Sequence, residues 1–496
     1  MKKNLIILCT DQMRGDCLGA NGRNPDIRTP NLDALAQRGV NFRQHYATFP
    51  KCVPARVSLM TGRYGHTDGY RTITQHMPFE QPDLLGTMLR AGYRAALFGK
   101  NHCWENLFEA THRPSQLKEG QRGHKIDHHS WTAGYADIYN KWKDAAEKEK
   151  ADAEPNPNRI KVSDLKTRFE YAGRRREAAD EAYTEQAIHF LENGVSGDQP
   201  FFLQVNIEKP HTPYGVEEPW FSMYDRKTIR QWPSELPEGA PLPYVAQRNV
   251  RTGHDIPEDV LREIQATYMG AVSKVDHLMG RIIHTIERLG LFENTVVVLW
   301  SDHGDFAGQY GLVEKWDTIF SDSLLNVPFV ICAPSLPKGK TVDALTDHTD
   351  IAPTLMELLG LDPLPGVHGE SLVPVVAGGR ARSAVFADGG HEDEMIARFQ
   401  HQPLPTNIAE SAKQATYREY PDSMARAKMI RTATHKLVTR TRGGNELYDL
   451  VSDPWEMINR YDDPAFLNVK SDLQQQLLEW CLRTDTDRPF QEHFGA

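Results

Sequence analysis

The sequence lacks several features that would place it in a specialised class of protein. Its 496 residues include only six cysteines, none spaced as C-x-x-C, so we expect neither a disulfide framework nor a paired-cysteine zinc site. No apolar run approaches the roughly 20 residues of a membrane-spanning helix. There is no internal repeat and no low-complexity tract. A net charge of −10 disfavours a broad nucleic-acid surface, so neither nucleic acid nor membrane is an expected partner.

The beginning of the chain, MKKNLIILCTDQ, does not resemble a secretory signal. Its apolar run of five residues is shorter than the roughly 7–15 residues that such a signal needs. We therefore expect a cytoplasmic location. The overall composition, with 40% hydrophobic and 25% charged residues, is ordinary for a folded protein with a sizeable core.

Short apolar runs rich in β-branched residues alternate with helical patterns over the first 300 residues. Five runs are typical of buried parallel strands: 4–11, 93–99, 200–207, 295–302 and 327–333. Helical patterns cover 29–39, 83–92, 180–194 and 259–290. This alternation predicts an α/β fold in which helices cover both faces of a sheet.

Changes in the pattern of apolar and charged residues along the chain predict a large domain and a smaller one. We assign residues 1–375 to the large domain and 376–496 to a smaller C-terminal α+β domain, with strands near 384–389 and 435–441 and a final helix at 471–484. Residues of about 104–180 are charged and irregular, which indicates an insertion. It either shapes a substrate entrance or is a solvated surface excursion.

Polar side chains follow four of the predicted strands, at the sheet edge where ligands of open α/β folds bind. Asp11, Gln12, Asp302 and His303 offer carboxylate, amide and imidazole ligands. Such a set suits Ca²⁺ or Mg²⁺, and the imidazole leaves Mn²⁺ open. The alternative is that the two aspartates only cap turns or helices.

A second group of residues at the same strand ends consists of hydrogen-bond donors. They are Lys100, His102, Lys209, His211 and Lys315. Together they could hold a tetrahedral anion and supply a proton to a leaving group. The alternative is a set of surface lysines and loop histidines without a shared role.

Cys52 stands in the segment TFPKCVPARVSLMTGR, at the expected start of a helix. Pro54 suits a first helical turn, where its missing N–H costs nothing. The free N–H groups and the positive end of the helix dipole favour an anion there, and Arg56 can reach the same region. Cys52 is thus either a reactive group or a thiol packed beneath a helix.

The motif Cys52-Val53-Pro54-Ala55-Arg56, followed by Thr61-Gly62-Arg63, resembles the C-x-P-x-R signature of type I sulfatases. Further segments are similar to elements of that family in the same order. They are ILCTDQMRGD, TPNLDALAQRGVNF, GKNH, KPHTPY, SDHGDFAGQYGLVEKW and ELYDLVSDPWEMIN. The resemblance covers nearly the whole chain except the insertion and part of the C-terminal region.

The resemblance implies an alkaline-phosphatase-like fold, with a central mixed sheet, and a sulfuric ester hydrolase activity in residues 1–375. It also implies that a maturation enzyme oxidises Cys52 to formylglycine, which is the nucleophile once hydrated. One hydroxyl of the hydrate attacks the sulfur of a sulfate ester, and the other later expels sulfate. A cation lowers the pKa of the attacking hydroxyl, and fixed positive groups offset charge on the sulfuryl oxygens.

The resemblance also assigns roles to individual residues. Asp11, Gln12, Asp302, His303 and the modified Cys52 would hold one divalent cation, with Ca²⁺ favoured and Mn²⁺ or Mg²⁺ as alternatives. Arg56 and Lys100 would steady the formylglycine, and His102 would be the base of the second step. His211 and Lys315 would bind the sulfate and protonate the leaving oxygen.

The sequence departs from the family pattern at both metal elements. Gln12 and His303 stand where many sulfatases have Asp and Asn, and this pairing also resembles phosphonate monoester hydrolases and choline sulfatases. Val53 and Ala55 replace residues that are usually small or serine. We therefore expect a small aryl, choline or sugar sulfate as substrate, with a phosphonate monoester or phosphodiester as the alternative. Whether the chain forms a homo-oligomer is left open.

Overall fold

The computed structural model describes residues 2–78, 80–104, 126–128, 171–174, 179–195, 197–252, 256–402 and 408–485. Most of the predicted insertion at 104–180 therefore lies outside the described residues. Within these ranges the chain forms a large mixed sheet, a separate four-stranded sheet and two small strand pairs.

The large sheet has eight strands in the order β11-β2-β10-β9-β1-β7-β4-β5. Their bounds are Lys340–Val342 (β11), Val40–Phe42 (β2), Phe329–Cys332 (β10), Thr295–Ser301 (β9), Asn4–Asp11 (β1), Phe201–Pro210 (β7), Arg94–Gly99 (β4) and Ile126–His128 (β5). The four strands β9, β1, β7 and β4 run parallel to one another. Four of the five strands expected from the sequence are thus parallel neighbours at the centre of the sheet.

The predicted parallel direction is wrong for the fifth strand, β10, which pairs antiparallel with both β9 and β2. The chain between β9 and β10 turns back at the edge where β9 ends and crosses no face of the sheet. A parallel neighbour would need a crossover to the opposite edge. Burial on both faces gives parallel and antiparallel strands the same apolar pattern, so the sequence did not distinguish them.

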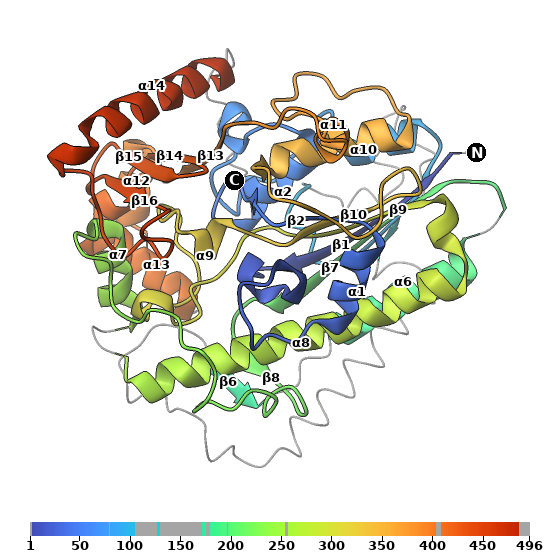
Figure 1. Cartoon of the computed structure of the whole chain (residues 1–496), viewed down its shortest axis with the longest axis horizontal. Coiled ribbons are helices and arrows are strands. Elements are labelled where there is room, and N and C mark those ends of the chain that lie inside the picture. The colour runs from blue at the N-terminus through green and yellow to red at the C-terminus, as the bar shows by residue number, and fades with distance from the viewer. Residues whose placement is uncertain are drawn as a thin grey trace.

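Helices cover both faces of the large sheet, as the sequence predicts (Figure 1). On one face lie α1 (Pro30–Arg38), α6 (Ala179–His189) and α8 (Glu258–Arg288), which pack against Ile6 and Leu8 of β1. On the other lie α2 (Cys52–Thr61), α3 (Leu84–Arg90), α10 (Ile351–Leu359) and α11 (Val373–Val376), packed against Leu5 and Ile7. Successive residues of a strand point to opposite faces, so β1 supplies both cores.

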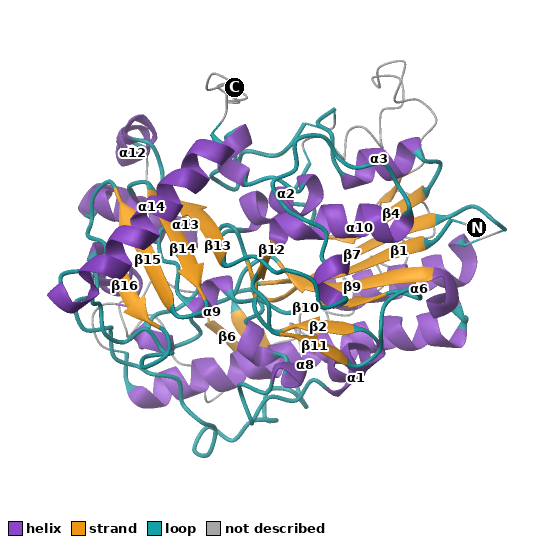
Figure 2. Cartoon of the chain, turned by 45° about the horizontal axis from the view of Figure 1, so that its top comes forward, coloured by secondary structure: helices purple, strands orange, loops and turns teal. Residues whose placement is uncertain are grey.

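The four-stranded antiparallel sheet lies beside the large one (Figure 2). It contains β13 (Ala384–Gly389), β14 (Ala427–Thr432), β15 (His435–Arg440) and β16 (Glu446–Asp449), with α12 (Asp393–Gln400), α13 (Ile408–Glu419) and α14 (Leu467–Thr484) nearby. Val385 and Met429 of this sheet pack against Tyr46 and Phe320. The secondary structure expected after residue 376 is present, and the domain boundary itself stays a prediction.

The remaining described elements are short. They are β3 (His45–Tyr46), β12 (Thr346–Asp347), β6 (Tyr171–Arg174), β8 (Tyr214–Val216), α7 (Leu242–Gln247) and α9 (Asp322–Leu325). The edge strand β5 and the strand β6, which pairs with β8, are the parts of the insertion region that the structure describes as strands.

Candidate active site

Four central strands end at the same edge of the large sheet and carry the predicted site residues. Asp11 is the last residue of β1, and Asp302 follows β9 directly. Lys100 follows β4, and His211 follows β7. Because these strands are parallel neighbours, their carboxyl ends bring the four side chains to one place.

Cys52 is the first residue of α2, which begins at this same edge. The first helical hydrogen bond joins the Ala55 N–H to the carbonyl of Lys51, at 3.2 Å. The helix ends at Gly62, whose φ of 69° is a left-handed conformation that suits glycine. Cys52 is 2% exposed, so if this cysteine is the reactive group, the reaction takes place in a buried site.

Four buried side chains converge in what we call the four-residue cluster: Asp11, Cys52, Asp302 and His303. One ligand atom from each lies within 4.8 Å of the others. The Cys52 sulfur is 3.2 Å from His303 Nε2 and 3.8 Å from Asp11 Oδ1. Two carboxylates, an imidazole and a sulfur at such spacing form a donor set that fits one divalent cation.

Two positively charged side chains, those of Arg56 and Lys100, bind the carboxylates of this cluster. Arg56 donates from Nε to Asp302 Oδ2 at 2.9 Å and from a terminal nitrogen to Asp11 Oδ2 at 3.2 Å. Lys100 Nζ is 2.7 Å from the same Asp11 oxygen. Each aspartate therefore keeps Oδ1 directed away from these cations, where it can serve a metal ion.

The electrostatics of the cluster show that like charges are held together. Burial raises the pKa of Asp302, and the neighbouring carboxylate of Asp11 raises it further. Burial also opposes ionisation of Asp11, but Lys100 and Arg56 hold its pKa well below the ordinary value. Two carboxylates whose pKa values are pushed apart are typical of a functional site, and a bound cation would favour the ionised form of both.

The Cys52 thiol has an unusual environment for a buried cysteine. Burial raises its pKa and Asp11 adds to this, but Lys315, Lys100 and His303 outweigh both, so the pKa lies well below its ordinary value. Cys9 and Cys103 are also buried, and burial raises the pKa of each. Cys52 is thus distinguished from these structural thiols by its charged neighbours.

Gln12 lies beside the cluster in a strained conformation, with a φ of 75°. Its backbone N–H donates to Asp302 Oδ1 at 3.1 Å, and its carbonyl accepts from the Tyr268 hydroxyl at 2.7 Å. Its side chain accepts from Lys315 Nζ at 2.6 Å and donates through Nε2 to Asp305. The structure therefore places Gln12 between Asp302 and Lys315, and its role as a metal ligand stays a prediction.

His211 and Lys315 form one hydrogen-bonded pair. His211 Nδ1 is 2.7 Å from the carbonyl of Thr212, so it carries the ring proton, and Nε2 accepts from Lys315 Nζ at 3.0 Å. Burial lowers the pKa of His211 well below its ordinary value, and Lys315 and Lys100 lower it further. Lys315 is therefore the donor and His211 the acceptor in this pair.

Among the described residues, His102 makes no hydrogen bond to the four-residue cluster. Its φ is 41°, and its ring lies 6.1 Å from that of His76 in an edge-on arrangement. Its buried Nδ1 has no hydrogen-bond partner among the described residues. The predicted role of His102 as a base stays a prediction. Lys209, the remaining sequence candidate, donates to the carbonyl of Pro213 at 3.0 Å.

Sequence reasoning missed three residues that support Gln12, either directly or through Asp305. Asp305 accepts from Gln12, Tyr214 and the N–H of Ala307, and burial raises its pKa against the lowering effect of these bonds. Tyr214 lies on β8, and Tyr268 lies in the middle of α8. Asp305 belongs to the motif that already contains Asp302, which was the available signal. Nothing in the periodic pattern of α8 distinguishes Tyr268 from a core residue.

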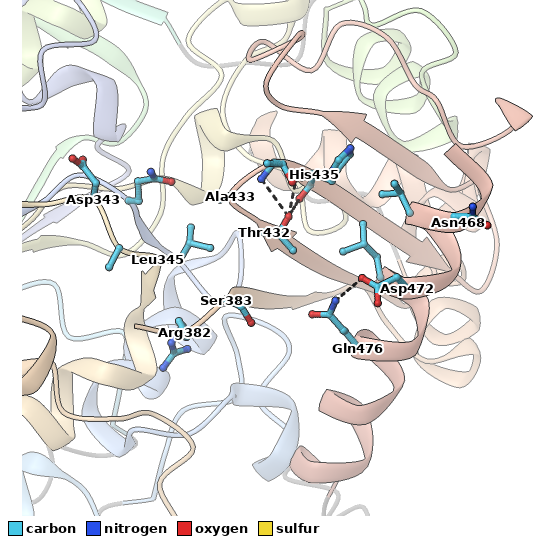
Figure 3. Close-up of a pocket in the computed structure, with 15 residues that line it drawn as sticks. Asp343, Leu345, Arg382, Ser383, Thr432, Ala433, His435, Asn468, Asp472 and Gln476 are labelled. Carbon is cyan, nitrogen blue, oxygen red and sulfur yellow. Dashed lines mark hydrogen bonds between the residues drawn. The ribbon is translucent and has the colours of Figure 1, made fainter. Parts of the chain in front are cut away.

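A separate cavity of about 760 Å³ lies at the four-stranded sheet (Figure 3). Asp472 and Gln476 of α14 lie on one side of it, and Asp343 and Leu345 lie opposite. None of its lining residues belongs to the predicted site. We therefore locate the chemistry by the donor set at the strand ends and not by this cavity.

Comparison with known proteins decides the family. A family model described as Sulfatase matches residues 3–361. The chain belongs to the sulfatase family. The named sulfatases of this family are sulfuric ester hydrolases, so the predicted class of enzyme is confirmed.

The sulfatase chain is similar to several curated proteins along nearly its whole length. It is 26% identical to the multifunctional alkaline phosphatase superfamily protein PehA of Trinickia caryophylli, covering 97% of this chain and 95% of that protein. It is 27% identical to an ulvan-active sulfatase of Formosa agariphila, covering 96% and 80%. It is 26% identical to a choline-sulfatase of Rhizobium meliloti, covering 93% and 83%.

Solved structures confirm the fold of the sulfatase. The phosphonate monoester hydrolase of Agrobacterium radiobacter superimposes with a TM-score of 0.73 at 24% identity, covering 97% of this chain and 96% of that one. A 2-O GAG sulfatase gives a TM-score of 0.70 at 22% identity, covering 98% and 93%. The alkaline-phosphatase-like mixed sheet expected from the sequence is therefore present. Among the described residues, no helix is both long and apolar enough to cross a bilayer.

Proposed function

We propose that this protein hydrolyses a small sulfate ester, such as an aryl, choline or sugar sulfate, through a formylglycine made from Cys52. The observation that carries the proposal is the position of the Cys52 sulfur, at the start of α2 and within reach of Asp11 and His303. A group at this position can contact both a cation held by the carboxylates and a substrate entering at the sheet edge.

The donor set supports one divalent cation at the four-residue cluster, with Asp11, Asp302, His303, Gln12 and the modified Cys52 as its ligands. The oxygen-rich set favours Ca²⁺, and the imidazole keeps Mn²⁺ and Mg²⁺ as alternatives. A cation here would lower the pKa of a hydroxyl on residue 52 and offset negative charge that develops on the substrate.

The remaining residues have distinct tasks in this scheme. Arg56 and Lys100 hold Asp11 and Asp302 in place and keep positive charge near residue 52. Lys315 carries the proton that it shares with His211, so the pair can bind a sulfuryl oxygen and protonate the leaving alcohol. His102 would take a proton in the step that releases sulfate.

The alternative is a phosphonate monoester or phosphodiester hydrolase with the same nucleophile. Gln12 and His303, instead of the Asp and Asn of many sulfatases, favour it. Lys100 and His102 favour the sulfatase, because these two donors follow the sulfatase pattern. Rates on an aryl sulfate, an aryl phosphonate monoester and a phosphate diester distinguish the two. If the sulfate were by far the poorest of the three substrates, the sulfatase proposal would be wrong.

The role of Cys52 has its own test. Mass spectrometry of the peptide that contains Cys52 should reveal an aldehyde in place of the thiol. The variant Cys52→Ala should lose turnover, whereas Cys332→Ala, which removes a buried thiol of β10, should keep it. Unchanged activity of Cys52→Ala would overturn the proposal. The maturation enzyme, the cytoplasmic location and the oligomeric state stay predictions.

A further inference from the structure

The side chain of Gln12 has two chemically different ends, and each end meets a neighbour that accepts only one of them. Lys315 carries an ammonium group, which donates hydrogen bonds and accepts none. The end of Gln12 that lies 2.6 Å from Lys315 Nζ must therefore be the carbonyl oxygen, Oε1. The opposite end, Nε2, donates to Asp305 Oδ2.

Asp305 is itself held by two donors, so it cannot turn to suit Gln12. Its Oδ1 accepts from the Tyr214 hydroxyl at 2.7 Å and from the Ala307 N–H at 2.6 Å. Among the described residues, Gln12 is the partner left for Oδ2. Asp305, Gln12 and Tyr214 are buried, so bulk solvent does not reach these bonds.

We propose that Asp305 is a positioning residue that fixes the amide of Gln12 with its oxygen toward the metal site and its nitrogen away from it. This inference rests on the proposed cation at the four-residue cluster. An amide ligates a hard cation through oxygen and not through its NH₂ group. A glutamine at this position therefore needs a partner that specifies which end faces the ion, whereas an aspartate or glutamate, with two equivalent oxygens, does not.

The substitution Asp305→Asn should reverse this orientation. The introduced asparagine would keep its single oxygen toward the Ala307 N–H, because that backbone donor cannot move away. Its NH₂ group would then face Gln12 Nε2, and two donors would oppose each other. Gln12 must either flip, which turns its NH₂ group toward the cation and Lys315, or leave the site. Either way the site loses an oxygen ligand.

The second substitution Gln12→Glu should repair the defect. The introduced glutamate accepts from the new asparagine amide at one oxygen and offers the other to the cation and Lys315. The double variant also has the same net charge as the unaltered protein, because one carboxylate has only moved across the hydrogen bond. Recovery in the double variant, at unchanged net charge, is the result that the direction of this bond predicts.

The measurement is Mn²⁺ affinity, by titration of metal-free protein, with melting temperature followed in parallel. We expect Asp305→Asn to weaken Mn²⁺ binding by about 10–100-fold, as supporting residues of metal ligands do. The double variant Asp305→Asn/Gln12→Glu should return to within about threefold of the unaltered protein, because it restores both oxygen ligation and net charge.

The control for loss of charge is Glu314→Gln. Glu314 is a buried carboxylate that pairs with Arg251 near Asp305 but makes no hydrogen bond to Gln12 among the described residues. It should change Mn²⁺ affinity by no more than about threefold, because it removes charge without affecting the amide. If Glu314→Gln weakened binding as much as Asp305→Asn, or if the double variant bound no better than Asp305→Asn, the proposal would be overturned.

Two results separate this inference from the proposed function. If the unaltered protein binds Mn²⁺ and Asp305→Asn binds it equally well, only the role of Asp305 fails. If Asp305→Asn does not fold, a crystal structure of the Mn²⁺-loaded unaltered protein decides the matter. It should place one end of the Gln12 amide on the ion and the other on Asp305, and a Gln12 side chain that lies away from the ion would exclude the proposal.

Discussion

Two buried charge clusters meet at the start of α2, and they differ in which groups converge. In the four-residue cluster, the carboxylates of Asp11 and Asp302 and the Cys52 sulfur converge on one point. In what we call the Asp317 cluster, a single carboxylate accepts from Lys51, Lys413 and His391, at 2.5, 3.2 and 3.1 Å. The first cluster gathers ligand atoms at one point, whereas the second pairs one carboxylate with three donors.

The Asp317 cluster joins the segments that carry Cys52 and Lys315 to the C-terminal region. Lys51 directly precedes Cys52, and Asp317 lies two residues after Lys315. His391 follows β13, and Lys413 lies on α13. The comparison teaches that neighbouring buried charges are arranged in two ways: in one cluster ligand atoms face one another, and in the other opposite charges pair across segments that are far apart in the chain.

The largest effect should follow from removing a carboxylate of the four-residue cluster. Asp302→Ala should lose metal binding and lower kcat/KM by on the order of 10³-fold or more, because the cation supplies several kcal/mol to the reaction. Metal content and sulfate ester turnover, measured on the same preparation, check this. Activity within tenfold of the unaltered protein would show that the cluster holds no catalytic cation.

Breaking the Asp317 cluster should affect folding first. Lys51→Met removes one buried partner, at 3% exposure, and should lower the free energy of unfolding by about 3 kcal/mol. Urea unfolding at neutral pH measures this. The metal affinity of the folded variant should change little, and a metal defect as large as that of Asp302→Ala would erase the distinction between the two clusters.

The stability of the protein should fall in mild acid because of His391. Burial lowers the pKa of this imidazole to about 4, although its bond to Asp317 opposes the shift. Between about pH 6.5 and pH 4 the unfolded chain binds a proton that the folded protein does not, so the free energy of unfolding decreases as pH falls, by about 3 kcal/mol. Above pH 6.5 this contribution is fully present.

Urea unfolding at pH 7.5 and pH 5 tests the contribution of His391. The variant His391→Gln keeps a donor for Asp317 but cannot titrate, so it should lose about half or more of the pH dependence in this window. An unchanged slope in that variant would assign the acid sensitivity to other groups.

The smallest effect is expected at the exposed side of the Asp317 cluster. Lys413 is 26% exposed, so its ion pair with Asp317 is partly screened by solvent. Lys413→Met should lower the free energy of unfolding by about 1 kcal/mol or less, because Lys51 and His391 still satisfy the carboxylate. A loss equal to that of Lys51→Met would mean that burial does not set the strength of these pairs.

Much of the fold was predictable because its signals are local. The apolar runs at 4–11 and 295–302 correspond to β1 and β9 within one residue, and the helical pattern at 83–92 contains α3. The direction of β10 was not predictable. Its apolar residues record burial on both faces, and strand direction depends on where the connecting loop returns.

The candidate site was predictable to the level of residue types at strand ends. Asp11, Cys52 and Asp302 lie together as their motifs suggest, and Gln12 and Lys315 lie beside them. The sequence did not reveal Tyr268 and Tyr214, whose hydroxyls act at long separation in the chain. Nor did it reveal that Lys51 and Asp317 pair with each other, because 266 residues separate them.

The sequence by itself determined which chemical groups the protein has and which strand ends carry them. It placed a cysteine before a proline and an arginine, two aspartates after apolar runs, and lysines and histidines after others. Only the tertiary structure decided which carboxylate oxygens bind Arg56 and Lys100, which end of Gln12 faces Lys315, and which buried charges pair. The physical reason is that hydrogen-bond direction and charge balance depend on neighbours that folding brings together from distant parts of the chain.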